Sequence, residues 1–174
     1  SPTEFADLQA RKSFLSQLMA SFGKACEPSK VSGQFEKEDL KIENGVMTFV
    51  YTLASDSECS NALMSYTNQS EYTLGDAVAE QSGSYKMTST LKSSLLTLYS
   101  SSFVDSYNAM PYGDGSGNVA YNYPAGTFKA GEAVDIKGRM INVNGKPEAL
   151  SDDTIVKFND SGAVCFVDGK EDCY

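Results

Sequence analysis

The chain of 174 residues contains no histidine and no tryptophan. Without histidine, Ser-His-Asp and Cys-His catalysis are excluded, and so is any metal site with an imidazole ligand. Arginine occurs only as Arg11 and Arg139, so the residues that usually clamp phosphate groups are scarce. These absences predict a protein that is not an enzyme, with no catalytic residue, metal or cofactor.

Long apolar runs are also missing, since no stretch approaches the roughly 20 residues that span a bilayer. We therefore expect the globular part not to be embedded in a membrane. The formal net charge is −9, and such a surface repels nucleic acid and anionic lipid. The expected partners are proteins, either like subunits or a basic target. The length predicts one domain over residues 1–174.

Four cysteines are present, Cys26, Cys59, Cys165 and Cys173. None has the Cys-x-x-Cys spacing of redox or zinc sites. An even number without that spacing is typical of disulfides in an oxidising compartment. Three pairings are possible, and we favour Cys26–Cys59 with Cys165–Cys173, because partners close in sequence meet most easily. This predicts an extracytoplasmic location, at the cell surface, outside the cell or in the periplasm.

The N-terminal segment has the pattern of an amphipathic helix. Ser1 and Glu4 form a possible capping box, and Pro2 suits the first helical position. Gly23 is suited to end the helix. We therefore expect a helix over residues 3–24 whose apolar stripe packs on the core. The stripe consists of Phe5, Leu8, Leu15, Leu18, Met19 and Phe22.

The middle of the chain gives a hairpin signal followed by helical spacing. Asn44-Gly45, within 39–54, is typical of a type I′ turn between two strands. A short helix carrying the second cysteine is expected over 57–69. A further helical region is expected over 71–109, because several large apolar residues recur there at helical spacing. They are Leu91, Leu95, Leu98, Tyr99, Phe103 and Tyr107.

The last third of the chain has the pattern of short strands separated by tight turns, which is typical of an antiparallel sheet. The expected strands lie within 119–123, 132–143, 153–158 and 163–167, with turns at 144–145, 159–162 and 168–169. With helices first and strands last, the predicted fold class is α+β. It has a long N-terminal helix packed on an antiparallel sheet, additional helices in the middle and a disulfide-stapled C-terminus.

A glycine-rich segment at 111–118 was tested against the calcium-loop pattern. Asp114, Ser116 and Asn118 match its first ligand positions, but Val119 and Ala125 replace the required glycine and glutamate. The EF-hand pattern therefore fails. A surface loop is the favoured interpretation, and weak calcium binding is the alternative.

Acidic residues gather at Glu36, Glu38 and Asp39 and again at Asp152 and Asp153. A pair of carboxylates can hydrolyse glycosides when one of them lies in an apolar pocket with a raised pKa. The sequence does not show such a pairing, and solvated surface charge is the favoured interpretation in so acidic a chain.

The order of these features resembles the globular part of type IV pilins and minor pilins. The resemblance rests on "GKACEP", then "KIENGVMTFVYTLASDSECSNAL", then "TIVKFNDSGAVCFVDGKEDC". It implies that helix 3–24 is the remainder of the pilin spine and that the last two cysteines close a terminal disulfide loop. The function that it implies is a non-enzymatic subunit of a bacterial surface fibre or secretion apparatus.

The same resemblance implies that the loops at 111–118 and 166–172 are the recognition surfaces. The residues expected there are Tyr112, Asp114, Ser116, Asn118, Asp168 and Lys170. The alternative is a secreted or periplasmic acidic binding protein, of the inhibitor or immunity type. Such a protein captures a basic partner at a rate that falls as salt rises.

Overall fold

The computed structural model describes residues 1–109, 119–121, 123–124, 126–137, 140–142 and 149–174. The elements of the first part are α1 (Pro2–Leu18), β1 (Ser21–Gly23), β2 (Glu27–Pro28), β3 (Phe35–Ile42), β4 (Val46–Ala54), β5 (Ala62–Ala77) and β6 (Tyr85–Leu98). Those of the second part are α2 (Ser101–Ala109), β7 (Val119–Tyr121), β8 (Ala133–Asp135), β9 (Met140–Asn142), β10 (Ser151–Phe158), β11 (Val164–Asp168) and β12 (Lys170–Cys173).

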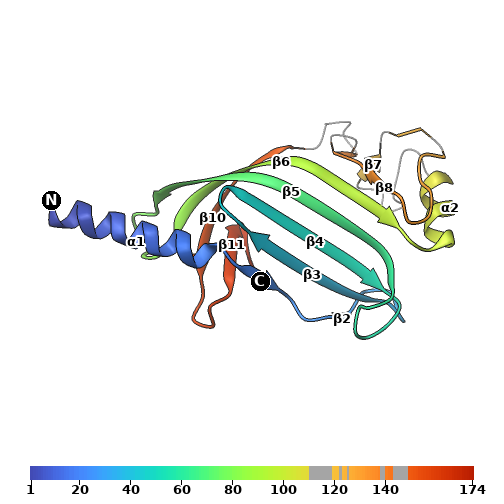
Figure 1. The fold of residues 1–174 in the computed structure, drawn as a ribbon, viewed down its shortest axis with the longest axis horizontal. Coiled ribbons are helices and arrows are strands. Elements are labelled where there is room, and N and C mark those ends of the chain that lie inside the picture. Colours follow the sequence, from blue (N-terminus) through green and yellow to red (C-terminus); the bar gives the residue numbers. More distant parts are fainter. Residues whose placement is uncertain (110–118, 122, 125, 138–139, 143–148) are drawn as a thin grey trace.

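Most of the described strands belong to one curled antiparallel sheet, shown in Figure 1. Its strand order is β1-β3-β4-β5-β6-β10-β11-β12, with β2 beside β3 and β8 beside β6. Strands β7 and β9 form a separate pair. Helix α1 lies at one end of the sheet and α2 lies at the other (Figure 1). The predicted α+β class is therefore wrong, because the fold is mainly antiparallel β with two helices among the described residues.

Helix α1 confirms the predicted start but not the predicted end. The Ser1 hydroxyl accepts a hydrogen bond from the Glu4 amide, and the capping box is complete. The helix ends at Leu18, and the chain then continues into β1. The apolar stripe does not pack along its whole length, since Phe5 is 65% exposed and Leu8 is 49% exposed. The last turns alone reach the core, through Phe14 and Leu18.

The helix predicted over 57–69 is wrong. The Asp56 carboxylate accepts hydrogen bonds from the backbone amides of Ser60 and Asn61, which folds this segment into a loop. Cys59 has a φ of 55°, which a right-handed helix does not allow. The cysteine-bearing short helix of the pilin pattern is therefore a turn that leads into β5.

The helical region predicted over 71–109 is also wrong up to residue 98, where the chain forms the end of β5 and all of β6. The spacing of the leucines misled because Leu91 and Leu95 lie on opposite faces of β6, and Leu95 is 39% exposed. β6 also contains a bulge. Gln69 pairs with Ser93, and Ser70 pairs with Leu91, so that Lys92 is an extra residue. The inserted residue reverses the alternation beyond it, so Leu98, seven residues after Leu91, returns to the same face as Leu91, as it would in a helix. The helical part is α2 alone.

The strands predicted on either side of Asn44-Gly45 and near the C-terminus are confirmed. β3 and β4 are joined at this turn, where Gly45 has a φ of 79°. Asn44 does not have the positive φ of a type I′ turn. The predicted segment 132–143 divides into β8 and β9. The turns at 159–162 and 168–169 lie between strands, and the turn at 144–145 lies outside the described residues.

Two hydrophobic clusters fill the two ends of the curled sheet. The cluster below α1 contains Phe14, Leu18, Leu40, Ile42, Leu74, Tyr85, Met87, Val156 and Val164. The cluster at the α2 end contains Leu53, Met64, Leu96, Leu98, Tyr123 and Phe128. The concave face is thus covered at both ends, while no helix of the described residues lies over its middle.

The predicted disulfide pairing is confirmed. Cys26 is bonded to Cys59, and Cys165 is bonded to Cys173. The second bond joins residues directly opposite each other on β11 and β12, and so fixes the last strand to the sheet. The two disulfides indicate an oxidising, extracytoplasmic environment.

Candidate functional site

The middle of the concave face forms a groove with a volume of about 360 Å³, which we call the central groove. Residues from β3, β4, β5, β6, β10, β11 and β12 line it. Alternate residues of a strand point to the same face, so each strand contributes every second side chain to the groove. The lining residues are Leu40, Met47, Phe49, Asn68, Ser70, Ser89, Leu91, Asp152, Thr154, Phe166, Asp168, Lys170, Asp172 and Tyr174.

The floor of the central groove is apolar and rich in aromatic rings. The Tyr174 ring lies 6.1 Å from the Phe49 ring and 6.1 Å from the Phe166 ring, measured between centroids, and both contacts are edge-on. Leu40 is buried, and Leu91 is half-buried. This floor suits an apolar group that enters from solvent, because such a group would leave water on contact with the rings.

Carboxylates stand at the mouth of the central groove. Asp152 at the start of β10 and Asp168 at the end of β11 are both exposed. Neither carboxylate forms a hydrogen bond or ion pair with another residue in the part of the chain that the structure describes. Lys170 lies opposite Asp168 in the β11–β12 register, and it too has no ion pair among the described residues. Two unpaired negative charges therefore flank the apolar floor.

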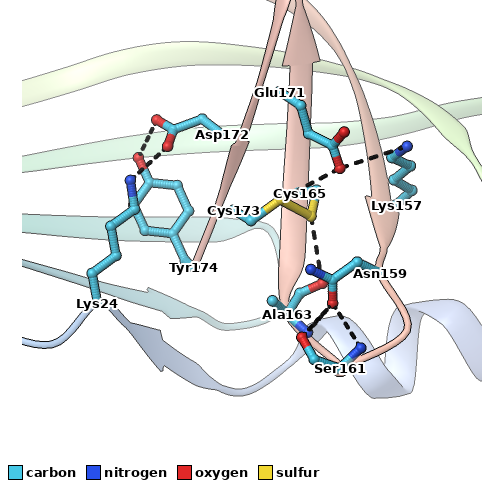
Figure 2. Close-up of a disulfide and its surroundings, with 10 residues drawn as sticks. All are labelled: Lys24, Lys157, Asn159, Ser161, Ala163, Cys165, Glu171, Asp172, Cys173 and Tyr174. Carbon is cyan, nitrogen blue, oxygen red and sulfur yellow. Dashed lines mark hydrogen bonds and ion pairs between the residues drawn. A yellow bond between two sulfur atoms is a disulfide. The ribbon is translucent and has the colours of Figure 1, made fainter.

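A lysine joins the two edges of the curled sheet beside the groove (Figure 2). The Lys24 ammonium lies 2.6 Å from an Asp172 carboxylate oxygen on β12, as Figure 2 shows. The same ammonium lies 2.9 Å from a Glu38 carboxylate oxygen on β3. It also lies 4.6 Å from the centre of the Tyr174 ring. We call this arrangement the Lys24 latch. It joins the two sides of the sheet through side chains.

The Lys24 latch is an ionised cluster. Burial lowers the pKa of Lys24, but hydrogen bonds to Asp172 and Glu38 outweigh burial, and the net pKa lies above 10.5. Burial raises the pKa of Asp172, but hydrogen bonds from Lys24 and Tyr174 outweigh that effect and leave the pKa below 3.8. Lys24 and Asp172 are therefore both charged at neutral pH.

Tyrosines extend this polar cluster along the concave face. Tyr51 and Tyr66 stack with their centroids 5.2 Å apart, and the Tyr51 hydroxyl donates a hydrogen bond of 2.8 Å to Glu36. Burial raises the pKa of both tyrosines, and the nearby carboxylates raise it further. These phenols therefore stay neutral at neutral pH and provide aromatic surface, and the Tyr51 hydroxyl serves as a hydrogen-bond donor.

The sequence-predicted site residues have different outcomes. Asp168 and Lys170 lie at the mouth of the central groove, on either side of the β11–β12 turn. The glycine-rich segment lies outside the described residues, and with it the predicted recognition residues Tyr112, Asp114, Ser116 and Asn118. Cys165, Glu171 and Cys173 lie close together, but their sulfurs form a disulfide and are not free to bind a metal.

The acidic pair at 152–153 does not act as a pair. Asp152 lines the central groove, while the Asp153 carboxylate accepts a hydrogen bond of 2.9 Å from the Thr88 hydroxyl. Neighbours in a strand point to opposite faces, so the two carboxylates are separated by the sheet. Sequence reasoning missed Lys24 and Tyr174 as site residues, because their contacts depend on how far the sheet curls.

No family model matches this chain, and no curated protein is significantly similar to it. No helix among the residues that the structure describes is both long enough and apolar enough to cross a membrane.

Proposed function

We propose that the protein is a non-enzymatic binding protein of an extracytoplasmic compartment, the cell surface or the periplasm, and that the central groove captures a basic protein partner. The observation that carries this proposal is the open middle of the concave face, where an apolar floor meets unpaired carboxylates. Such a combination of an apolar surface with a few oriented polar groups is typical of binding sites.

The charges support a basic partner over an acidic one. Three aspartates and one lysine line the central groove, and the Lys24 ammonium neutralises Asp172. The chain as a whole carries a formal net charge of −9. Such a surface speeds the encounter with a positive partner and repels a negative one, an effect that weakens as ionic strength rises.

The test is site-specific photo-crosslinking in the cells that make the protein. A photoreactive phenylalanine replaces Leu91, which lines the central groove, or Leu95, which lies on the same strand and is 39% exposed on the convex face. We expect the position 91 variant to crosslink to a basic protein and the position 95 variant not to do so. The captured protein, once purified, should bind with an affinity that decreases as salt is added.

Two results would contradict the proposal. One is equal crosslinking from positions 91 and 95, which would mean that the groove has no special role. The other is a partner from position 91 whose affinity does not depend on salt, because charge complementarity predicts such a dependence.

A second candidate, a subunit of a bacterial surface fibre or secretion apparatus, is favoured by α1. Residues 1–10 are all exposed, and this half of the helix extends beyond the sheet in Figure 1. Phe5 and Leu8 lie on it without a buried contact, as in a helix that packs against neighbouring subunits. The fibre hypothesis expects the gene to encode about 20 apolar residues just upstream of Ser1. A cleavable signal peptide directly before Ser1 would contradict it.

A further inference from the structure

We infer that the group recognised by the central groove is a lysine side chain of the protein partner, with its ammonium between Asp152 and Asp168 and its alkyl chain on the aromatic floor. This inference rests on the proposed function, and it names the chemistry that selects the partner.

The protein's own Lys24 shows that the concave face can hold an ammonium group in this way. Its ammonium bridges one carboxylate from β3 and one from β12 and lies over an aromatic ring. The side chain is only 31% exposed, so the arrangement holds a cation that has lost much of its water. Two carboxylates on different strands with a ring beside them are thus a favourable site for an ammonium on this face.

Asp152 and Asp168 repeat that arrangement at the groove mouth, without a cation from the described residues. Ile155 pairs with Val167 in the β10–β11 ladder, so Thr154 lies opposite Asp168 and Asp152 is one diagonal step away. Diagonal neighbours of this kind have Cα atoms about 7–8 Å apart. One ammonium group can therefore bridge both carboxylates with its separate N–H donors.

The floor next to these carboxylates matches the rest of a lysine side chain. Phe166 lies two residues before Asp168 on β11, and Leu91 lines the same groove from β6. A lysine has a flexible stem of four carbons, which packs on apolar surface while the ammonium stays at the polar edge. A guanidinium is less suitable, because its planar fork is best matched to a single carboxylate.

Replacing Lys170 should change the affinity for a lysine side chain in the opposite direction from replacing either aspartate. It lines the groove next to Asp168 and is exposed, so its positive charge opposes an incoming ammonium. Replacing it by methionine removes this repulsion and keeps an unbranched apolar stem. The inference therefore expects Lys170→Met to strengthen binding, whereas neutralising either aspartate weakens it.

The experiment titrates the ¹⁵N-labelled full chain with two probe peptides and follows backbone amide shifts by NMR. One probe is acetyl-Ala-Leu-Lys-Leu-Ala-amide, and the other carries Nε-acetyl-lysine in the same position. Asp152→Asn and Asp168→Asn are the test variants. Asp153→Asn is the matched control, because it changes the net charge equally and alters the opposite face of the sheet.

We expect the lysine probe to shift amides around the central groove and the acetylated probe to bind at least tenfold more weakly. Asp152→Asn and Asp168→Asn should each raise the Kd of the lysine probe about fivefold, or about 1 kcal/mol. Asp153→Asn should change it less than about twofold, and Lys170→Met should lower it about twofold, since exposed charges interact weakly.

Three outcomes would overturn the inference. They are no binding of the lysine probe, shifts that lie outside the groove, and equal losses for Asp152→Asn and Asp153→Asn. The last would mean that net charge alone attracts the peptide. None of these results contradicts the proposed function, which is decided by the crosslinks from position 91. Conversely, peptide binding as expected but no crosslink from position 91 would contradict the proposed function and not the lysine site.

Discussion

The Lys24 latch should contribute more to the free energy of unfolding than an ordinary surface lysine does. Lys24 and Asp172 are 148 residues apart in sequence, and their contact joins the two edges of the curled sheet. Replacing Lys24 by methionine keeps an apolar stem but removes both ion pairs and the contact with the Tyr174 ring. It also leaves Glu38 and Asp172 on the concave face without their shared cation.

The magnitude follows from the burial of these groups. A hydrogen bond to a charged group contributes about 1.5–3 kcal/mol when it is shielded from water, and an exposed ion pair contributes about 0–1 kcal/mol. The side chains of Lys24, Glu38 and Asp172 lie between these limits, with exposed fractions of 31%, 27% and 43%. We therefore expect Lys24→Met to lower the free energy of unfolding by about 2 kcal/mol.

The matched control is Lys41→Met. Lys41 forms one ion pair with Glu43, and both side chains are about 60% exposed, so its loss should cost less than about 0.5 kcal/mol. The assay is urea unfolding at pH 7, followed by far-ultraviolet circular dichroism. Equal losses for the two variants would refute the reasoning, because they would mean that the latch behaves as an ordinary surface pair.

The contribution of the Lys24 latch to stability should also depend on pH. The pKa of Asp172 is lowered below 3.8, so its contribution is present above that value and is lost as the pH falls through the folded pKa. The pKa of Lys24 is raised above 10.5, so its contribution persists until the pH exceeds that value. The difference between wild type and Lys24→Met should therefore be constant from pH 5 to pH 9 and shrink below about pH 4. A difference that stays constant down to pH 2 would contradict this account.

Two further predictions concern packing and the last disulfide. Replacing both Cys165 and Cys173 by serine should lower the free energy of unfolding by about 2.5 kcal/mol for a separation of 8 residues, as measured by urea unfolding. Its effect should not add fully to that of Lys24→Met, since both changes release β12, and full additivity would show that the two are independent. Leu18→Ala should cost about 3 kcal/mol because Leu18 is fully buried, whereas Leu8→Ala should cost less than about 0.5 kcal/mol. Equal thermal melting shifts for the two leucine variants would show that α1 does not anchor the core through Leu18.

The parts of the fold that the sequence predicted depend on local signals. The turn at Asn44-Gly45 needs a residue that tolerates positive φ, and Gly45 supplies it. The two disulfides join cysteines that are nearest in sequence. The capping box at Ser1 is likewise complete within four residues. The turn and the capping box depend on neighbours in sequence, and the disulfide pairing follows the order of the cysteines, so a single sequence carries enough information to predict them.

The parts that were wrong depend on tertiary structure. Residues 71–98 have leucines at spacings of three and four, but Leu91 and Leu95 lie on opposite faces of β6. The bulge at Lys92, which returns Leu98 to the face of Leu91, is visible only in the pairing with β5. The serines and threonines of β6 weaken a helix and are acceptable on a half-exposed sheet. Helix α1 ends at Leu18 because the chain must turn to pair Phe22 with Leu40. Helical periodicity alone does not contain that requirement.

The central groove could not be predicted from the sequence, for a related reason. Alternation along 46–53 shows that β4 has one large apolar face, but not that this face is concave or that its middle stays open. Asp152 and Asp153 are equivalent in sequence, and the sheet alone assigns one to the groove and the other to the convex surface. A site built from seven strands becomes recognisable only when the curl of the sheet is known.

The last strand connects stability with the proposed binding. Among the described strands, β12 pairs with β11 alone. It is fixed by the Cys165–Cys173 bond and carries Asp172, which the Lys24 latch holds. The same strand brings Lys170 and Asp172 to the central groove. Loss of the disulfide would therefore loosen one wall of the groove as well as the end of the chain. The oxidising compartment that the cysteines indicate is, on this account, a condition for a formed binding site.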